Sequence, residues 1–208
     1  MLALQESVID REQATTTTTE ATTTTDGTVD TLDELEQVDK DALLTAKEVG
    51  QDFTEDTYEG GTSTGPCTDA HPDELIKPAV HVGAASGRQD AGYEQAIRIY
   101  DDEAEGKEAF ANFKESISCD GGTITKDDGS TSEVTLGDEV DMAGINKHID
   151  EGYARQAGTT GAKGYVVVTR LGASVITFQF FSAEGTDDST LPDIPTVISK
   201  AMDKEAAA

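Results

Sequence analysis

The chain has 208 residues, 36% of them hydrophobic and 5% aromatic, which suits one domain with one hydrophobic core plus a stretch of unfolded chain. It carries 42 acidic and 15 basic residues, and the formal net charge of -27 repels nucleic-acid phosphates and anionic lipid headgroups. Nucleic acid is therefore excluded as an expected partner. Cations, basic ligands and a basic protein partner stay compatible with this charge, which also suits simple solubility or adaptation to high salt.

Two features of the sequence bear on membranes and targeting. No apolar run reaches the roughly 18 residues of a transmembrane helix, and the opening MLALQESVID lacks the basic start and long hydrophobic stretch of a signal peptide. We therefore expect the sequence shown to be soluble.

Residues 1–41 are rich in Thr, Glu and Asp, and the run Thr15–Thr25 reads TTTTTEATTTT. Scattered single Leu and Val residues cannot offset the entropy of ordering such a segment, which predicts a disordered linker. Thr-rich segments of this kind typically act as spacers, and their hydroxyls accept glycans in some organisms. We expect the folded domain to span residues 42–205.

The first predicted element is a short helix in LLTAKEVGQDF. Thr45 and Glu48 have the spacing of a capping box, and Val49 and Phe53 lie one helical turn apart. The following GGTSTGPCTDAHPDE reads as a loop, and DELIKPAV as a brief helix that stops near Pro78.

In YEQAIRIYDD, polar and apolar residues alternate as in a half-buried strand. The alternation places Gln95, Ile97 and Ile99 on one side of the strand and Ala96, Arg98 and Tyr100 on the other.

The next segment, DDEAEGKEAFANFKESISC, predicts a helix. Phe110, Phe113 and Ile117 recur at helical spacing behind an acidic first turn. Gly106 inside this helix is expected to weaken it by roughly 1 kcal/mol relative to Ala.

The remaining chain alternates strands and turns before a final helix. The segment GTITKDDGSTSEVTL predicts two strands around an Asp-Gly turn, and HIDEGYARQA predicts a further strand. The segment GYVVVTRLGASVITFQFF predicts a pair of strands that turns at Leu171 to Ala173. Its apolar residues occupy both faces, so we expect both faces of this pair to be covered. A helix with a narrow apolar stripe closes the chain, and its apolar residues are Ile194, Val197, Ile198, Ala201 and Met202. This order favours an α+β fold on an antiparallel sheet packed with helices.

The chain has two cysteines, Cys67 and Cys119, and no further sulfur ligands for a zinc site. A disulfide between them would fit an oxidising compartment, as would the Thr-rich spacer. Two unpaired thiols are the alternative.

No catalytic or cofactor motif is present. There is no GxSxG, and GAASGRQD offers only Ser86, in what reads as a flexible loop. GTTGAKG lacks the spacing of a phosphate loop, and His71, His81 and His148 are too scattered for a metal site, although His71 with Asp73 or Glu74 could hold an ion adventitiously. We expect no enzyme activity, no bound metal and no cofactor.

One set of residues is unusual for so acidic a chain. Three arginines and three polar residues lie in or beside predicted strands: Arg98, Tyr100, Tyr153, Arg155, Arg170 and Gln179. If strand pairing brings them to one sheet face, they could bind an anionic or polar ligand in a cleft. Ion pairs with the many carboxylates are the alternative.

Several segments together resemble one family. They are ALLTAKEV, Cys67, IRIYDDEAEGKEAFANF, Cys119, LGDEV and VVVTRLGASVITFQFF. Between Ala42 and Lys204 the chain is similar to actinobacterial secreted lipoproteins related to the extracellular sensor domain of a mycobacterial serine/threonine protein kinase. The resemblance implies a twisted antiparallel sheet, helices, a ligand cleft outside the cell, and a lipid anchor upstream of the linker on a cysteine that this sequence does not contain. It also implies two disulfides, whereas this chain has cysteines for one.

These observations favour a non-enzymatic, extracytoplasmic, sensor-like lipoprotein domain on a flexible stalk, with a small molecule, glycan or envelope component as its ligand. The alternative is a protein interaction module, such as an accessory subunit, adhesin or inhibitor, that uses its acidic surface against a basic partner.

Overall fold

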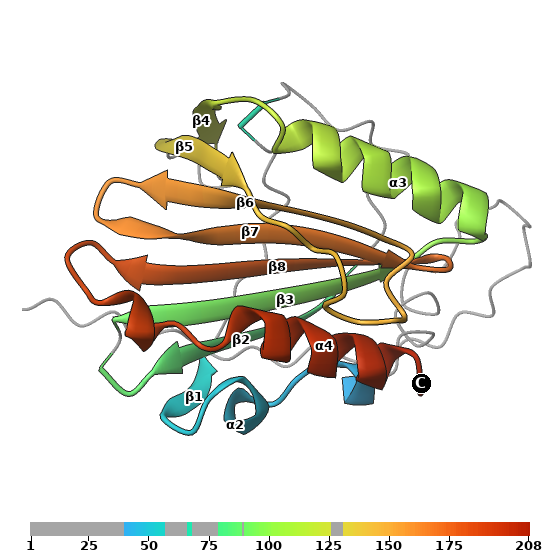
Figure 1. Cartoon of the computed structure of the whole chain (residues 1–208), viewed down its shortest axis with the longest axis horizontal. Coiled ribbons are helices and arrows are strands. Elements are labelled where there is room, and N and C mark those ends of the chain that lie inside the picture. Colours follow the sequence, from blue (N-terminus) through green and yellow to red (C-terminus); the bar gives the residue numbers. More distant parts are fainter. Residues whose placement is uncertain (1–39, 57–65, 68–78, 89, 126–130) are drawn as a thin grey trace, which may run out of the picture.

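The computed structural model describes residues 40–56, 66–67, 79–88, 90–125 and 131–208. Eight strands form a single antiparallel sheet in the order β1-β2-β3-β8-β7-β6-β5-β4, with helices packed against it (Figure 1). The expected α+β class and antiparallel sheet are therefore confirmed.

The elements have the following bounds. The strands are β1 (Phe53–Asp56), β2 (Val80–Ser86), β3 (Ala91–Ile99), β4 (Gly121–Thr125), β5 (Thr131–Glu139), β6 (Glu151–Thr159), β7 (Ala162–Leu171) and β8 (Ser174–Ala183). The helices are η1 (Lys40–Ala42), α2 (Ala46–Val49), α3 (Glu103–Ser116), η3 (Asp188–Thr190) and α4 (Ile194–Glu205). No helix among the described residues has the length and apolarity needed to cross a bilayer.

Both faces of the central strands are buried, as predicted for the β7–β8 pair. Neighbouring residues of a strand point to opposite faces, so Val167 packs in one apolar cluster and Val168 in another. The first cluster contains the apolar stripe of α4, and the second contains Ala109 and Phe110 of α3. We call these the α4 side and the α3 side of the sheet.

The α4 side also holds the N-terminal part of the described chain. Leu44 is 1% exposed and packs with α4 and β3, and its backbone N–H donates to Gln95 Oε1 over 3.1 Å. The Tyr93 hydroxyl donates to the same oxygen over 2.9 Å. Since Gln95 is 1% exposed, its amide fixes the segment before α2 onto the centre of the sheet.

The predicted capping box at the start of α2 is present. Glu48 Oε2 accepts hydrogen bonds from both the backbone N–H and the hydroxyl of Thr45, each 2.8 Å long. The helix is shorter than the sequence suggested, because Phe53 opens β1 and is not in the helix. The predicted helix before Pro78 and nearly all of the predicted linker lie outside the described residues; only Lys40 and Asp41 of the linker are described, in η1.

Two expectations about β2 and β3 are wrong. Ser86 ends β2 and is not in a loop; its hydroxyl donates to Asp90 Oδ1 over 2.7 Å and accepts from the N–H groups of Asp90 and Ala91. The strand β3 is buried on both faces, because β2 and β8 flank it and both sides of the sheet are covered there. The alternation of polar and apolar residues along β3 does not mark an exposed face, because polar side chains such as Gln95 are buried too.

Helix α3 forms where predicted, with Asp102 accepting the Glu105 N–H over 2.9 Å at its N-terminus. Gly106 faces the sheet, and a Cβ built on it would lie 3.0 Å from backbone atoms of Ala173. The glycine thus lets α3 approach the β7–β8 turn closely, which explains a residue that helix propensity alone disfavours.

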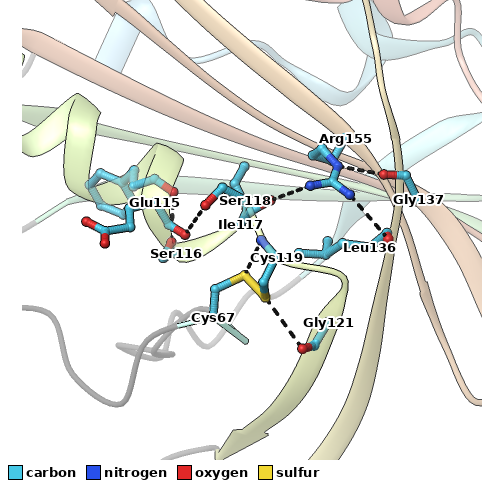
Figure 2. Close-up of a disulfide and its surroundings, with 11 residues drawn as sticks. Cys67, Glu115, Ser116, Ile117, Ser118, Cys119, Gly121, Leu136, Gly137 and Arg155 are labelled. Carbon is cyan, nitrogen blue, oxygen red and sulfur yellow. Dashed lines mark hydrogen bonds between the residues drawn. A yellow bond between two sulfur atoms is a disulfide. The ribbon is translucent and has the colours of Figure 1, made fainter.

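The predicted disulfide joins Cys67 to Cys119, with 5.5 Å between their Cα atoms (Figure 2). The Cys67 N–H donates to the carbonyl oxygen of Ser116 over 3.2 Å. The bridge therefore fastens a segment 52 positions away to the C-terminal end of α3.

Candidate functional site

Strand pairing brings the predicted arginines to one face. Arg98 of β3 pairs with Val175 of β8, which pairs with Arg170 of β7, so the three lie in one row across the sheet. Directly opposite residues share a face, and Val175 belongs to the α3 side. In a parallel row, Arg155 pairs with Val166, which pairs with Gln179.

The two tyrosines of the predicted set lie on the same side. Tyr153 pairs with Val168, and both belong to the α3-side cluster together with Tyr100, which follows β3 directly. Burial raises the pKa of Tyr100 to about 12. The structure thus places all six predicted residues on the α3 side, but α3 packs over part of this face.

Arg170 contacts groups of the protein itself. Its side chain is 6% exposed, and its nitrogens lie 2.9 Å from Glu151, 3.4 Å from Asp150 and 3.5 Å from Glu103, the first residue of α3. It also donates to the carbonyl oxygen of Gly172 over 2.8 Å. Arg170 therefore joins the N-terminus of α3 to β6 and to the β7–β8 turn.

Arg155 plays the corresponding part at the other end of α3. Its Nε–H donates to the Gly137 carbonyl over 2.6 Å, and its terminal nitrogens lie 3.5 Å from the Ile117 carbonyl and 3.4 Å from that of Leu136 (Figure 2). Ile117 is the C-terminal cap of α3. A guanidinium at the negative end of a helix is electrostatically favoured, so Arg155 stabilises the junction of α3, β5 and β6.

Two further cations of this layer lie over aromatic rings. The Arg98 guanidinium is 5.2 Å from the centroid of Phe113, and the Lys114 ammonium is 4.9 Å from that of Tyr153. Each pair links α3 to a strand. Gln179 differs from the others, since its side chain is exposed.

A hollow of about 290 Å³ opens on the opposite face of the sheet, over β5, β6 and β7. Its side chains come from Thr135, Gln156, Lys163, Tyr165 and Leu191. Tyr165 and Leu191 are half-buried and pack against the α4-side core, which gives the hollow an apolar wall. Gln156 and Thr135 are exposed and supply an amide and a hydroxyl.

Glycines form the floor of this hollow. Gly158 lies between Thr135 of β5 and Lys163 of β7, and a Cβ on it would lie 3.0 Å from the Thr135 hydroxyl. At Gly137 a Cβ would lie 3.1 Å from the Gln156 side-chain oxygen. The hollow exists because these two strand positions carry no side chain.

The hollow differs in charge from the rest of the protein. None of the described residues that line it is acidic, although 42 of the 208 residues of the chain are. Lys163 supplies the positive charge, and it helps to lower the pKa of Asp187, after the larger effect of hydrogen bonds from Ser189. The described lining itself therefore carries one positive charge and no negative charge, with the Asp187 carboxylate close enough to Lys163 for the two charges to interact.

Sequence reasoning did not find this hollow. GTTGAKG, rejected as a phosphate loop, covers residues 158–164. It contains the two-residue turn between β6 and β7, where Gly161 has a φ of 85°, and it supplies Gly158, Lys163 and Gly164 to the lining of the hollow. The sequence did contain a signal, because glycines that lie on the same face of two neighbouring strands leave a gap there. Only the strand register shows that Gly137 of β5 and Gly158 of β6 are such a pair.

The histidines considered as metal ligands from the sequence form no metal site in the described part of the structure. His71 lies outside the described residues, and His148 lies 3.9 Å from Asp203 at the surface. Within the described residues, no group of three or more His, Cys, Asp or Glu side chains is placed to hold a metal ion.

Comparisons with known proteins support the fold. No protein-family model matches the chain, and the search of curated proteins gives no match. Among solved structures, the chain is similar to the extracellular domain of PknH from Mycobacterium tuberculosis, with a TM-score of 0.53 and 12% sequence identity. The match covers 80% of this chain and 94% of that one. The resemblance noted in the sequence is therefore confirmed at the level of the fold.

Proposed function

We propose that this chain is a non-enzymatic, extracytoplasmic, sensor-like domain that binds a small molecule, glycan or envelope component. In this proposal, residues 1–41 act as a flexible stalk, and a lipid anchor upstream of them holds the domain at the membrane. The likeness of the fold to an extracellular domain of a kinase is the observation that carries the proposal. A shared fold is an analogy, so the ligand must come from the site.

Two features of the chain agree with the proposal. The Cys67–Cys119 disulfide suits an oxidising compartment. The hollow over β5 to β7 combines an apolar wall with a few polar groups, as small-molecule sites usually do.

The α3 side of the sheet, with Arg98, Arg155 and Arg170, is a second candidate for the ligand site. The ion pairs of Arg170 and the carbonyl contacts of Arg155 favour a structural role for both residues. Gln179 is the member of the set whose exposed side chain is open to a ligand.

Native mass spectrometry tests the proposal. The oxidised chain is mixed with cell-envelope extract and weighed in that mixture under non-denaturing conditions, so that weakly bound ligands are also detected. We expect a retained added mass of defined size. If no small mass is retained and a protein is bound instead, the domain is an interaction module and the proposal is wrong.

That interaction module is the alternative function, supported by the net charge of -27. Salt dependence separates the two functions. Binding of a basic protein to the acidic surface weakens steeply between low and physiological salt, whereas burial of a small ligand in a hollow does not.

A further inference from the structure

We propose that the hollow over β5, β6 and β7 binds one pyranose-sized sugar unit, such as the end of a glycan. The inference rests on the proposed function and narrows it to a ligand class and a site. The size of the hollow, the chemistry of its side chains and its glycine floor point to this class of ligand.

The size of the hollow limits the ligand to about one ring. Its volume of about 290 Å³ falls just below the usual range for drug-sized ligands, which begins at about 300 Å³. An extended lipid chain or a dinucleotide would exceed this space. A single sugar ring that enters from the open side fits, with the rest of a glycan in solvent.

The polar groups match vicinal hydroxyls. A sugar hydroxyl both donates and accepts, and so do the Gln156 amide and the Thr135 hydroxyl. Thr135 donates to the Gly158 carbonyl over 3.3 Å, which leaves its oxygen lone pairs to accept from a ligand. The described lining holds one lysine and no carboxylate, and the Lys163 charge already interacts with Asp187 nearby. The hollow therefore suits a neutral sugar and offers too little charge for a polyphosphate.

The apolar groups match the other face of such a ligand. One face of a pyranose carries mainly C–H groups, and it can pack on the ring of Tyr165 next to Leu191. The Tyr165 ring is held by the α4-side core, so it is in place before the ligand arrives.

The glycine floor allows the close approach and supplies the sharpest variant. Gly158→Ala adds one methyl group to the hollow at a position without positive φ, and its only close neighbour is the end of the Thr135 side chain. Gly164 is unsuitable, because a Cβ there would collide with the Phe180 carbonyl. Gly87→Ala is the matched control, since its Cβ would meet only Asp52 O at 3.5 Å, away from the hollow.

The experiment titrates the isotope-labelled, oxidised chain with methyl glycosides of glucose, galactose, mannose, rhamnose, arabinose and N-acetylglucosamine, and follows amide NMR signals. For ligands of this size we expect a dissociation constant on the order of millimolar for at least one sugar. Shifts should centre on Gly158, Lys163 and Tyr165. Gly158→Ala and Tyr165→Leu should weaken binding by at least about tenfold, while Gly87→Ala should keep it.

Two results would overturn the inference. One is the absence of shifts around Gly158 for every glycoside up to about 50 mM, well above the expected constant. The other is binding that Gly158→Ala leaves unchanged. If envelope extract still yields a retained mass in either case, the proposed function survives and only the sugar site is wrong; if it yields none, both fail.

Discussion

Lys204 and Glu48 are 156 positions apart in sequence, yet the Lys204 ammonium lies 3.0 Å from Glu48 Oε2. The same ammonium donates to the carbonyl oxygen of Leu43 over 2.9 Å, and Lys200 donates to that of Glu48 over 3.0 Å. Helix α4 thereby holds the segment from Leu43 to Glu48 against the rest of the fold.

The first prediction concerns pH and Glu48. Burial opposes its ionisation, but hydrogen bonds from Thr45 and the Lys204 charge outweigh burial, so the pKa of Glu48 is lowered from 4.5. The folded state then binds fewer protons than the unfolded state around this pH, so the stabilisation is present above pH 4.5 and lost as pH falls through the lowered pKa.

Glu48→Gln should therefore cost stability, about 0.5–1 kcal/mol because the pair is partly exposed, at pH 7 but not at low pH. Urea unfolding of both proteins from pH 7 to pH 3 measures the difference. An equal difference at every pH would show that the Glu48 charge contributes nothing.

The second prediction concerns the disulfide. Closing a loop with 52 positions between Cys67 and Cys119 should contribute roughly 4 kcal/mol through the unfolded state. Urea unfolding of the Cys67→Ser/Cys119→Ser double variant should show this loss, and thiol titration of the native wild type should find no free sulfhydryl. Two titratable thiols in native protein would contradict the structure.

The third prediction separates helix propensity from packing at Gly106. Propensity alone makes Gly106→Ala stabilising by about 1 kcal/mol. Since the new methyl group would lie 3.0 Å from the Ala173 backbone, we expect a net loss of about 1–2 kcal/mol instead. The exposed Ala111 of α3 is the control, because Ala111→Gly should cost only the propensity term of about 1 kcal/mol. A stabilised Gly106→Ala protein would show that α3 does not pack this closely.

The fourth prediction concerns Arg170. Its removal leaves three carboxylates near one another, but they are 34%, 45% and 75% exposed and are partly solvated. We expect Arg170→Met to cost about 2 kcal/mol, less than for a fully buried pair. Arg88→Met, at an exposed position, should change stability by less than about 0.5 kcal/mol. Equal effects of the two substitutions would mean that Arg170 does not fasten α3.

The elements with strong local patterns were predictable. The α3 and α4 helices follow from apolar residues at helical spacing, and the β7–β8 pair from its β-branched runs on both sides of Gly172. The strand β2 was missed because VHVGAAS is short and rich in small residues, and its place next to β3 is set by pairing over distance.

The candidate site was predictable only in part. Sequence periodicity placed Arg98 and Tyr100 on one face, and the register then added Arg155, Arg170 and Gln179 to it. The partners of these residues depend on how α3 packs, which no local pattern reveals. The hollow depends on the absence of side chains at Gly137 and Gly158, and such an absence becomes visible only once β5, β6 and β7 are aligned.

The most direct test of ligand binding at the hollow is amide NMR of the labelled chain before and after equilibration with envelope extract. We predict that the shifted signals cluster at Gly158, Lys163 and Tyr165, and that Gly158→Ala strongly reduces these shifts. Shifts centred instead on α3, Arg98 and Arg170 would place the ligand on the α3 side, and an unchanged spectrum would contradict ligand binding altogether.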